Sequence, residues 1–448
     1  MNLIPTGIPS LDGALSGGFP RGSTILLAGN PGSGKTHLAV HILYNNMRRG
    51  LRGVYVSFAE TKKQFYRNAH QSGIDLSKME EAGLFKFYDM LTVPRDELEG
   101  MIAYLISDIV EFKPDIIVFD SVTVFGQMFG EAHLRSFLHS VIGRIVNALD
   151  SLAILIDEIP YGERRVGFGL EEFVVDGVIV LEMERMGEVI RRYLTIPKMR
   201  GRPLRRSAYE YVITEDGLEV LAIPELEFAE PEVLRSRLDT GVPGLDELLG
   251  GGLYEGSITL IAGPTGSGKT IMALNLASNL ASSGKKVLYI AYEESLAALR
   301  DTLEKLGLKE NFKIVSMIPE GRTPVEYYAL IKGLVEKEGF DVLVIDSLSA
   351  MQTHMDKKEF IKAVRYLQLL TKEKGITFIL TYITGGAYQL TSTGFSTLSD
   401  NLIFLTYEVP EKVGESLKRH ILVLKARRSK NDPTLKNFII GEGGIRIE

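Results

Sequence analysis

The chain has 448 residues, 45% of them hydrophobic, and a formal net charge of −6. A single hydrophobic core rarely grows beyond about 300 residues, so two domains are expected. Cysteine is absent, which excludes disulfides, thiolate nucleophiles and cysteine-ligated metal sites. The negative charge gives no general attraction for nucleic acid or anionic membranes. No apolar run is long enough to span a bilayer and the N-terminus has no secretory signal pattern, so we expect a soluble cytoplasmic protein.

A segment near the N-terminus is repeated in the second half of the sequence. The segment "TGIPSLDGALSGGFPRGSTILLAGNPGSGKT", which begins at Thr6, recurs from Thr240 as "TGVPGLDELLGGGLYEGSITLIAGPTGSGKT". The correspondence continues without a gap to Glu60 and Glu294, which indicates a duplicated domain rather than a shared short motif. Between the copies, the acidic, proline-flanked stretch "PELEFAEPEV" is typical of an exposed linker. We therefore predict a first domain over 1–223, a linker over 224–233 and a second domain over 234–448.

Short β-branched segments alternate with longer amphipathic segments in both copies. Near-continuous apolar strands separated by helices indicate an α/β domain, whose mostly parallel sheet has helices on both faces. Residues 176–201 and 400–428 look instead like pairs of strands joined by a tight turn, which would extend each sheet with antiparallel strands. The parallel strands are expected at 23–29, 53–58, 115–120 and 153–158, and again at 258–263, 286–292, 341–346 and 377–382.

Each copy carries a phosphate-binding loop. "GNPGSGKT" and "GPTGSGKT" both follow an expected strand and open an expected helix, which is the context this motif requires. Glycines let backbone N–H groups converge on phosphate oxygens, and the helix N-terminus favours the anion. Lys35 and Lys269 would reach the β- and γ-phosphates of a nucleotide, while Thr36 and Thr270 would bind Mg²⁺. The predicted nucleotide-binding residues are Gly29, Asn30, Pro31, Gly32, Ser33, Gly34, Lys35 and Thr36, and Gly263, Pro264, Thr265, Gly266, Ser267, Gly268, Lys269 and Thr270.

Two acids complete the predicted metal sites. Asp120 ends "DIIVFD" and Asp346 ends "DVLVID", and an acid at the end of a buried strand can hold Mg²⁺ or its bound waters. The alternative is that each acid only caps the next segment. His37 and His41 have the spacing of metal ligands on a helix, but no third ligand is evident nearby, which argues against zinc. We therefore predict ATP and Mg²⁺ as the cofactors.

The sequence also resembles a known family. Tandem "TGxxxLDxxLxGG" segments before the loops, "SFAET" and "AYEES" after the second strand, and "GLEEFVVDGVIVL" and "KMRG" further on are similar to the KaiC-like family of RecA-fold ATPases. The resemblance covers nearly the whole chain and implies two RecA-like domains, stacked as two rings that are normally hexameric, with ATP between subunits. The sequence ends without the C-terminal extension of the circadian member, so the resemblance does not imply a clock role. Cations that would reach a neighbour's phosphates are Lys198, Arg200, Lys425 and Arg427.

The resemblance implies that an acidic pair after the second strand carries catalysis. In the second domain this pair is Glu293 and Glu294, whereas the first domain has Ala59 followed by Glu60. A carboxylate there can orient the attacking water and accept its proton. Successive residues of a strand point to opposite faces, so Glu60 does not simply replace the missing acid unless a bulge brings it into the site. We expect both domains to bind ATP and the second to be the better catalyst.

Candidate phospho-acceptors, again by resemblance, are Ser396 and Thr397 in "GFSTLSDN". The alternative is that this stretch, rich in Ser and Thr, is only a flexible connection. Two other classes of function stay open: a DNA-processing motor of the recombinase or helicase type, favoured by the basic run 191–206, and a nucleotide-gated scaffold with little turnover. The expected partners are further copies of the chain and an unidentified protein, with nucleic acid as the alternative and no membrane association.

Overall fold

The computed structural model describes residues 3–93, 98–130, 134, 137–162, 174–186, 189–201, 208–214, 217–221, 236–317, 322–353, 355–387, 399–410, 412, 414 and 416–448. The chain divides into two compact units, Met1–Glu225 and Leu226–Glu448. The predicted linker, 224–233, lies outside the described residues. In the described part of the chain, no helix combines the length and apolar character needed to cross a bilayer.

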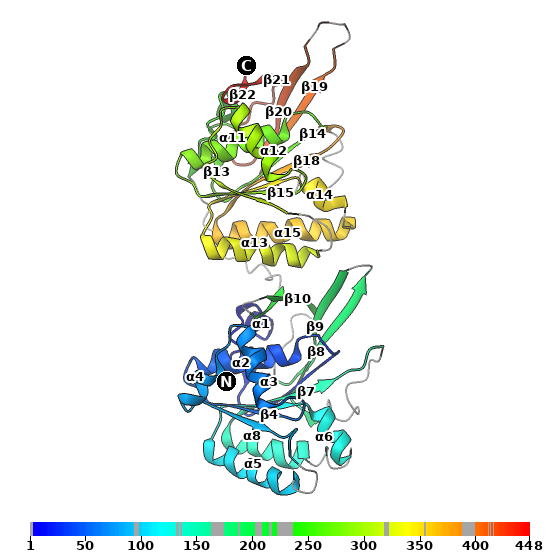
Figure 1. The fold of residues 1–448 in the computed structure, drawn as a ribbon. Helices are drawn as coiled ribbons and strands as arrows, with labels where there is room; N and C mark the ends of the chain where they lie inside the picture. The colour runs from blue at the N-terminus through cyan, green and yellow to red at the C-terminus, as the bar shows by residue number, and fades with distance from the viewer. Residues whose placement is uncertain are drawn as a thin grey trace. The chain divides into compact units, whose positions relative to one another are not determined.

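The first unit is built on one large sheet with helices packed against it (Figure 1). β3 to β8 run parallel, and β9, β10 and β11 then run antiparallel to one another. The strand order is β11 (Gly217–Leu221), β10 (Ala208–Thr214), β9 (Val189–Met199), β8 (Gly177–Met186), β3 (Thr24–Gly29), β7 (Leu152–Glu158), β6 (Ile116–Asp120), β4 (Gly53–Ser57) and β5 (Phe85–Asp89). The other elements are β1 (Leu3–Ile4), β2 (Phe19–Pro20), α1 (Pro9–Ala14), α2 (Lys35–Met47), α3 (Lys62–Gln71), α4 (Leu76–Glu81), α5 (Leu98–Phe112), α6 (Val122–Phe129), the π-helix η1 (Phe137–Ile142) and α8 (Gly143–Leu149).

The second unit repeats this plan. β14 to β19 run parallel, and β20, β21 and β22 continue the sheet in antiparallel fashion. The strand order is β16 (Lys313–Ser316), β15 (Val287–Ala291), β17 (Val342–Asp346), β18 (Thr377–Ile383), β14 (Ile258–Gly263), β19 (Asn401–Glu408), β20 (Lys418–Ala426), β21 (Lys436–Gly441) and β22 (Gly444–Ile447). The other elements are β12 (Arg237–Leu238), β13 (Leu253–Tyr254), α10 (Leu245–Leu248), α11 (Lys269–Ser282), α12 (Leu296–Lys305), α13 (Pro324–Glu338), α14 (Leu348–Thr353) and α15 (Lys357–Lys374).

The predicted fold class is confirmed: both units are mostly parallel α/β sheets, extended by antiparallel strands. The predicted strand pair at 176–201 is present, and its pairing reaches Met186 opposite Val189, so the connection is short. The pair at 400–428 is also present, but the prediction of a tight turn is wrong there. β19 ends at Glu408 and β20 begins only at Lys418, so a longer connection joins them.

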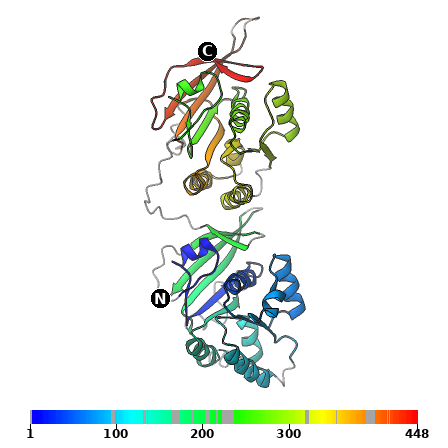
Figure 2. The ribbon, with the colours of Figure 1, turned by 90° about the vertical axis from the view of Figure 1, so that its left-hand side faces the viewer.

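Side-chain alternation along the strands divides the core of the first unit into two layers. On β3, Ile25 and Leu27 pack in the layer that contains α2 and α3, whereas Leu26 and Ala28 pack in the layer that contains α5, α6 and α8. Figure 2 shows helices on both sides of this sheet. Because the strands are covered on both faces, they read as near-continuous apolar runs in the sequence.

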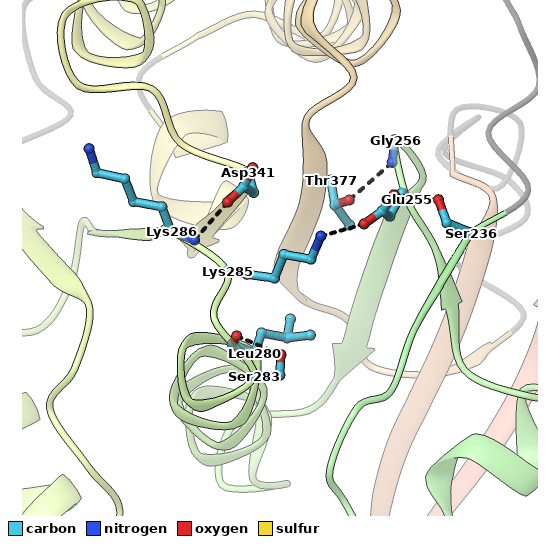
Figure 3. Close-up of polar contacts among 9 residues, drawn as sticks. All are labelled: Ser236, Glu255, Gly256, Leu280, Ser283, Lys285, Lys286, Asp341 and Thr377. Atoms are coloured by element: carbon cyan, nitrogen blue, oxygen red, sulfur yellow. Dashed lines mark hydrogen bonds and ion pairs between the residues drawn. The ribbon is translucent and has the colours of Figure 1, made fainter.

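Polar contacts tie together the amino ends of the strands in the second unit (Figure 3). The Lys285 ammonium lies 2.5 Å from the Glu255 carboxylate, and the backbone N–H of Lys286 donates to Asp341 across 2.8 Å. Glu255 precedes β14 and Asp341 precedes β17, so these contacts order the end of the sheet at which the strands begin. The carboxyl ends of the same strands carry the site described next.

Candidate nucleotide-binding sites

In each unit the phosphate loop runs from the end of a central strand into the first helix after it. Gly34, the residue before α2, has a φ of +94°, a left-handed conformation that glycine adopts at little cost. A Cβ on Gly29 would lie 2.2 Å from the carbonyl oxygen of Leu181, so only glycine fits at the end of β3. The second unit places the same limits on Gly263 and Gly268. The helix N-terminus behind each loop favours a bound anion.

The loop lysines are held over their own loops. The Lys35 ammonium donates to the carbonyl oxygens of Gly29 (2.8 Å) and Asn30 (3.0 Å), and Lys269 donates to the carbonyl oxygen of Pro264 (2.8 Å). Burial lowers the pKa of both lysines, and nearby acids oppose that shift. Each ammonium therefore lies where phosphate oxygens on the loop could replace the carbonyl contacts.

Thr36 and Asp120 come together in the first unit. The Thr36 hydroxyl donates to Asp120 Oδ2 across 2.9 Å, and the Tyr55 hydroxyl donates to the same oxygen across 2.6 Å. Burial raises the pKa of Asp120, while the hydrogen bonds from Tyr55 and Thr36 lower it. Mg²⁺ prefers hard oxygen ligands and keeps several waters or phosphate oxygens in its shell. The hydroxyl and carboxylate thus fit a Mg²⁺ ion that is shared with a nucleotide.

The second unit surrounds Asp346 in a related way. Its carboxylate accepts hydrogen bonds from Tyr289 (2.7 Å) and from the Thr381 hydroxyl, and Thr270 follows Lys269 in the first turn of α11. Sequence reasoning missed Tyr55 and Tyr289. The available signal was that tyrosine recurs at the same repeat position, in "GVYVSF" and "KVLYIAY".

The histidine pair is not part of a metal cluster in the described residues. The rings of His37 and His41 lie 4.4 Å apart, and burial lowers the pKa of His37. Within the part of the chain that the structure describes, no group of three or more histidines and acids could hold a metal ion.

Glu293 lies beyond the end of β15, near Ser347 and the phosphate-loop lysine. Ala291 packs in the layer that contains α11, and Tyr292 packs on the other side, against Tyr327 of α13. β15 ends at Ala291, and Glu293 lies in the bend that follows it. The Ser347 hydroxyl donates to Glu293 Oε1 across 2.8 Å. Glu293 is also one of the acids that oppose the lowered pKa of Lys269, which places its charge near the loop.

The neighbouring acids, Glu60 and Glu294, lie close enough to the strand-end aspartates for their charges to interact. Burial raises the pKa of Glu60 and of Glu294, and the charge of Asp120 or Asp346 in the same unit adds to the effect. The Glu60 carboxylate accepts a hydrogen bond from Asn68 of α3 across 3.1 Å. Ala59 is exposed and stands where the second unit has Glu293. α3 packs in the same core layer as the loop helix α2, so this contact places Glu60 on the loop side of the sheet.

Lys198 and Arg200 lie far from the phosphate loop of their own unit. Lys198 pairs with Val178 near the start of β8, whereas the loop follows the end of β3, which runs parallel to β8. The Lys198 ammonium donates to the carbonyl oxygen of Val175 (2.7 Å), and Arg200 forms an ion pair with Asp176 (3.3 Å). These cations therefore lie at the opposite end of the sheet from their own loop.

Lys425 and Arg427 have the same placement in the second unit. Lys425 pairs with Leu402 near the start of β19, and its ammonium donates to the carbonyl oxygen of Ser399 across 2.7 Å. Arg427 lies 3.6 Å from Asp400. The candidate phospho-acceptors, Ser396 and Thr397, lie outside the described residues.

Comparison with known proteins agrees with this architecture. The family model described as "ATPase: KaiC" matches the chain twice, over residues 4–225 and 238–448. A circadian clock oscillator protein KaiC of Picosynechococcus sp. is 30% identical, with 99% of this chain and 89% of the relative covered. A circadian clock protein KaiC3 of Synechocystis sp. is 30% identical, with 99% and 91% covered. A circadian clock oscillator protein KaiC of Synechococcus elongatus is 29% identical, with 99% and 88% covered. The resemblance inferred from the sequence is thus confirmed, and the chain belongs to the KaiC family of P-loop ATPases, in its tandem two-domain form.

Proposed function

We propose that the protein binds Mg-ATP in both domains and hydrolyses ATP mainly in the second. The observation that carries this proposal is the position of Glu293. It accepts a hydrogen bond from Ser347 and influences the pKa of Lys269, whereas the first domain has Ala59 at the corresponding place. The two domains thus share a phosphate-binding scaffold but differ in the acid beside it.

Nucleotide binding would use the same groups in both domains. Backbone N–H groups of the loop and the ammonium of Lys35 or Lys269 would bind phosphate oxygens, while Thr36 with Asp120, and Thr270 with Asp346, would hold Mg²⁺. The metal, when bound, neutralises charge on the β- and γ-phosphates. Tyr55 and Tyr289 hold the metal-site carboxylates in place through hydrogen bonds of 2.6 and 2.7 Å.

In the second domain, Glu293 would orient a water molecule toward the γ-phosphorus and accept one of its protons. The water oxygen forms a bond to phosphorus, the bond from phosphorus to the β–γ bridging oxygen breaks, and its electron pair leaves with ADP. The proton passes from Glu293 to solvent. Ser347 keeps the Glu293 carboxylate in a fixed orientation, and Glu294 lies beside it as a second acid.

The two cation pairs support a subunit-interface site. Because Lys198 and Arg200 lie at the opposite end of the sheet from their own loop, contact with phosphate requires another copy of the chain, and Lys425 and Arg427 have the same limitation. A cation supplied by a neighbour stabilises charge on the transferring phosphoryl group and can raise the rate by about 10³–10⁵. We therefore propose a homo-oligomeric ring, hexameric as the family resemblance implies, with a phosphorylation switch at Ser396 or Thr397.

The function is tested by phosphate release from the full chain and from Lys35→Ala and Lys269→Ala variants. We expect Lys269→Ala to remove most turnover and Lys35→Ala to remove little, while each variant still binds nucleotide in its unchanged domain. Equal losses would contradict the assignment of hydrolysis mainly to the second domain. Turnover that rises on addition of DNA would favour a motor instead, and negligible turnover by the unmodified chain would favour a nucleotide-gated scaffold.

A further inference from the structure

Each domain has an acidic side chain near the phosphate loop, but at a different position in the fold. In the first domain β7 ends at Glu158, which pairs with Gly29, the first residue of the phosphate loop. In the second domain the residue that pairs with Gly263 is Ile383. The domain that has Ala59 in place of the acid after the second strand therefore has an acid on the strand next to the loop, and the domain with Glu293 has an apolar residue there.

The backbone around this exchange is the same in both domains. The N–H of Glu158 donates to the Thr123 hydroxyl across 2.9 Å, and the N–H of Ile383 donates to the Ser349 hydroxyl across 2.7 Å. Each hydroxyl belongs to the segment that follows the metal-site acid. Since the main chain is held in the same way, the difference between the sites lies in the side chain.

Alternation along β7 directs Glu158 to the loop side of the sheet. Ile154 and Ile156 belong to the core layer that contains α2, and Glu158 is the next residue with that orientation. Asp157 points the other way, where it is buried and accepts hydrogen bonds from the Thr123 hydroxyl and the Glu158 N–H. Glu158 is exposed, so its carboxylate is open to solvent at the mouth of the loop.

The charge of Glu158 also affects the pKa of the loop lysine, Lys35. Burial lowers the pKa of Lys35, and Glu158 is the strongest of the acids that oppose this shift, ahead of Asp120. In the second domain, Asp346 and Glu293 oppose the lowered pKa of Lys269. Each loop lysine thus has the strand-end aspartate of its domain nearby. Lys35 also has Glu158 and Asp157 of β7, whereas Lys269 has Glu293, which follows β15.

We propose that Glu158 is the catalytic carboxylate of the first domain. This inference rests on the proposed ATPase function and assigns the slower turnover of that domain to a specific residue. The Glu158 carboxylate orients a water molecule and accepts one of its protons, the water oxygen bonds to the γ-phosphorus, and the bond to the β–γ bridging oxygen breaks with its electron pair leaving on ADP. The proton then passes from Glu158 to solvent.

The test uses the full chain with Lys269→Ala, so that turnover comes from the first domain. Adding Glu158→Gln should lower the rate of phosphate release by about 10²-fold or more, the usual effect of losing a general base. Adding Glu60→Gln should change it much less. The matched control is Glu111→Gln, an exposed acid on α5, which should leave the rate unchanged.

A binding measurement shows whether Glu158 acts in the transition state or only contributes to binding of ATP. Glu158→Gln should leave the affinity for a non-hydrolysable Mg-ATP analogue within about twofold, but weaken binding of ADP with aluminium fluoride by a factor similar to the loss in rate, because only the latter imitates the transition state. The proposal is overturned if Lys269→Ala leaves no turnover, if Glu158→Gln matches the Glu111→Gln control, or if both analogues weaken equally. Absence of turnover in the unmodified chain would instead overturn the proposed function itself.

Discussion

The Ser347 hydroxyl donates a hydrogen bond of 2.8 Å to Glu293. Ser347 and its counterpart in the first domain, Ser121, each accept a 3.4 Å hydrogen bond from a backbone N–H three residues later, but the first domain has Ala59 in place of the glutamate. The serine is common to both repeats, whereas the carboxylate that it orients is present in one. This contact makes Glu293 the residue whose substitution most directly tests the difference between the domains.

Glu293→Gln should remove most ATP turnover of the full chain. The amide keeps the size of the side chain but cannot accept the water proton, and loss of a general base costs about 10²–10⁴ in rate. The turnover that remains should be that of the first domain. Nucleotide affinity should be unchanged because phosphate binding depends on the loop. Phosphate release and equilibrium binding of a fluorescent ATP analogue measure the two quantities. Glu60→Gln serves as the comparison, and an equal loss from it would show that both domains contribute similar chemistry.

Tyr289→Phe should destabilise the second domain. The Tyr289 hydroxyl is fully buried and donates to Asp346 across 2.7 Å, and a hydrogen bond to a charged group contributes about 1.5–3 kcal/mol. We expect the free energy of unfolding of the second domain to fall by about that amount in nucleotide-free protein, followed by urea denaturation. Tyr407→Phe, at a half-buried position on β19, is the control. An unchanged unfolding transition in Tyr289→Phe would show that the contact contributes little.

The strand–loop–helix context of the phosphate-loop motifs, and the position of Asp120 and Asp346 at strand ends, could be predicted from sequence because their signals are local. A glycine-rich loop between a strand and a helix, and an acid at the end of an apolar strand, each lie within a few residues of one another. The role proposed for Glu158 could not be predicted in this way. It depends on β7 lying next to β3, a pairing between residues more than a hundred positions apart in the chain. The prediction of a tight turn between β19 and β20 was wrong because a hydrophobic pattern predicts the presence of a strand more reliably than the residue at which the strand ends.

Arg200→Ala should weaken ATP-dependent assembly. Arg200 is 61% exposed and its ion pair with Asp176 spans 3.3 Å. Exposed pairs of this kind contribute only about 0–1 kcal/mol, so the guanidinium can leave Asp176 for a neighbour's phosphate. Loss of a charged hydrogen bond of about 1.5–3 kcal/mol should raise the ATP concentration needed for half-maximal assembly about tenfold or more.

Size-exclusion chromatography with light scattering, over a series of Mg-ATP concentrations, measures this change. Arg49→Ala, at an exposed position just after α2, is the control and should assemble like the unmodified chain. A chain that stays monomeric at every ATP concentration would exclude the interface site altogether. Assembly of Arg200→Ala at the same ATP concentration as the control would remove Arg200 from that interface.

Mg-ATP should phosphorylate Ser396 or Thr397. The Lys425 ammonium donates to the Ser399 carbonyl oxygen across 2.7 Å, and Arg427 lies 3.6 Å from Asp400. The described residues that directly follow the candidate acceptors thus contact the cations proposed to reach a neighbour's ATP. If those cations bind that ATP, Ser399 and Asp400 lie at the same subunit interface, and positioning at such an interface supplies much of the catalysis in phosphoryl transfer.

The hydroxyl oxygen would form a bond to the γ-phosphorus of the neighbour's ATP, ADP would leave, and Glu293 of the second-domain site would accept the hydroxyl proton. The transferred group adds about −1.5 to −2 charge at pH 7, which Lys425 and Arg427 could then pair with, so modification should change assembly. Intact-mass and peptide mass spectrometry after incubation with Mg-ATP should find one added phosphate, lost in the double variant Ser396→Ala, Thr397→Ala and retained in Ser399→Ala. Unmodified protein during active turnover, or phosphate found only outside 391–399, would leave this segment as a connection and the protein as an ATPase without kinase activity.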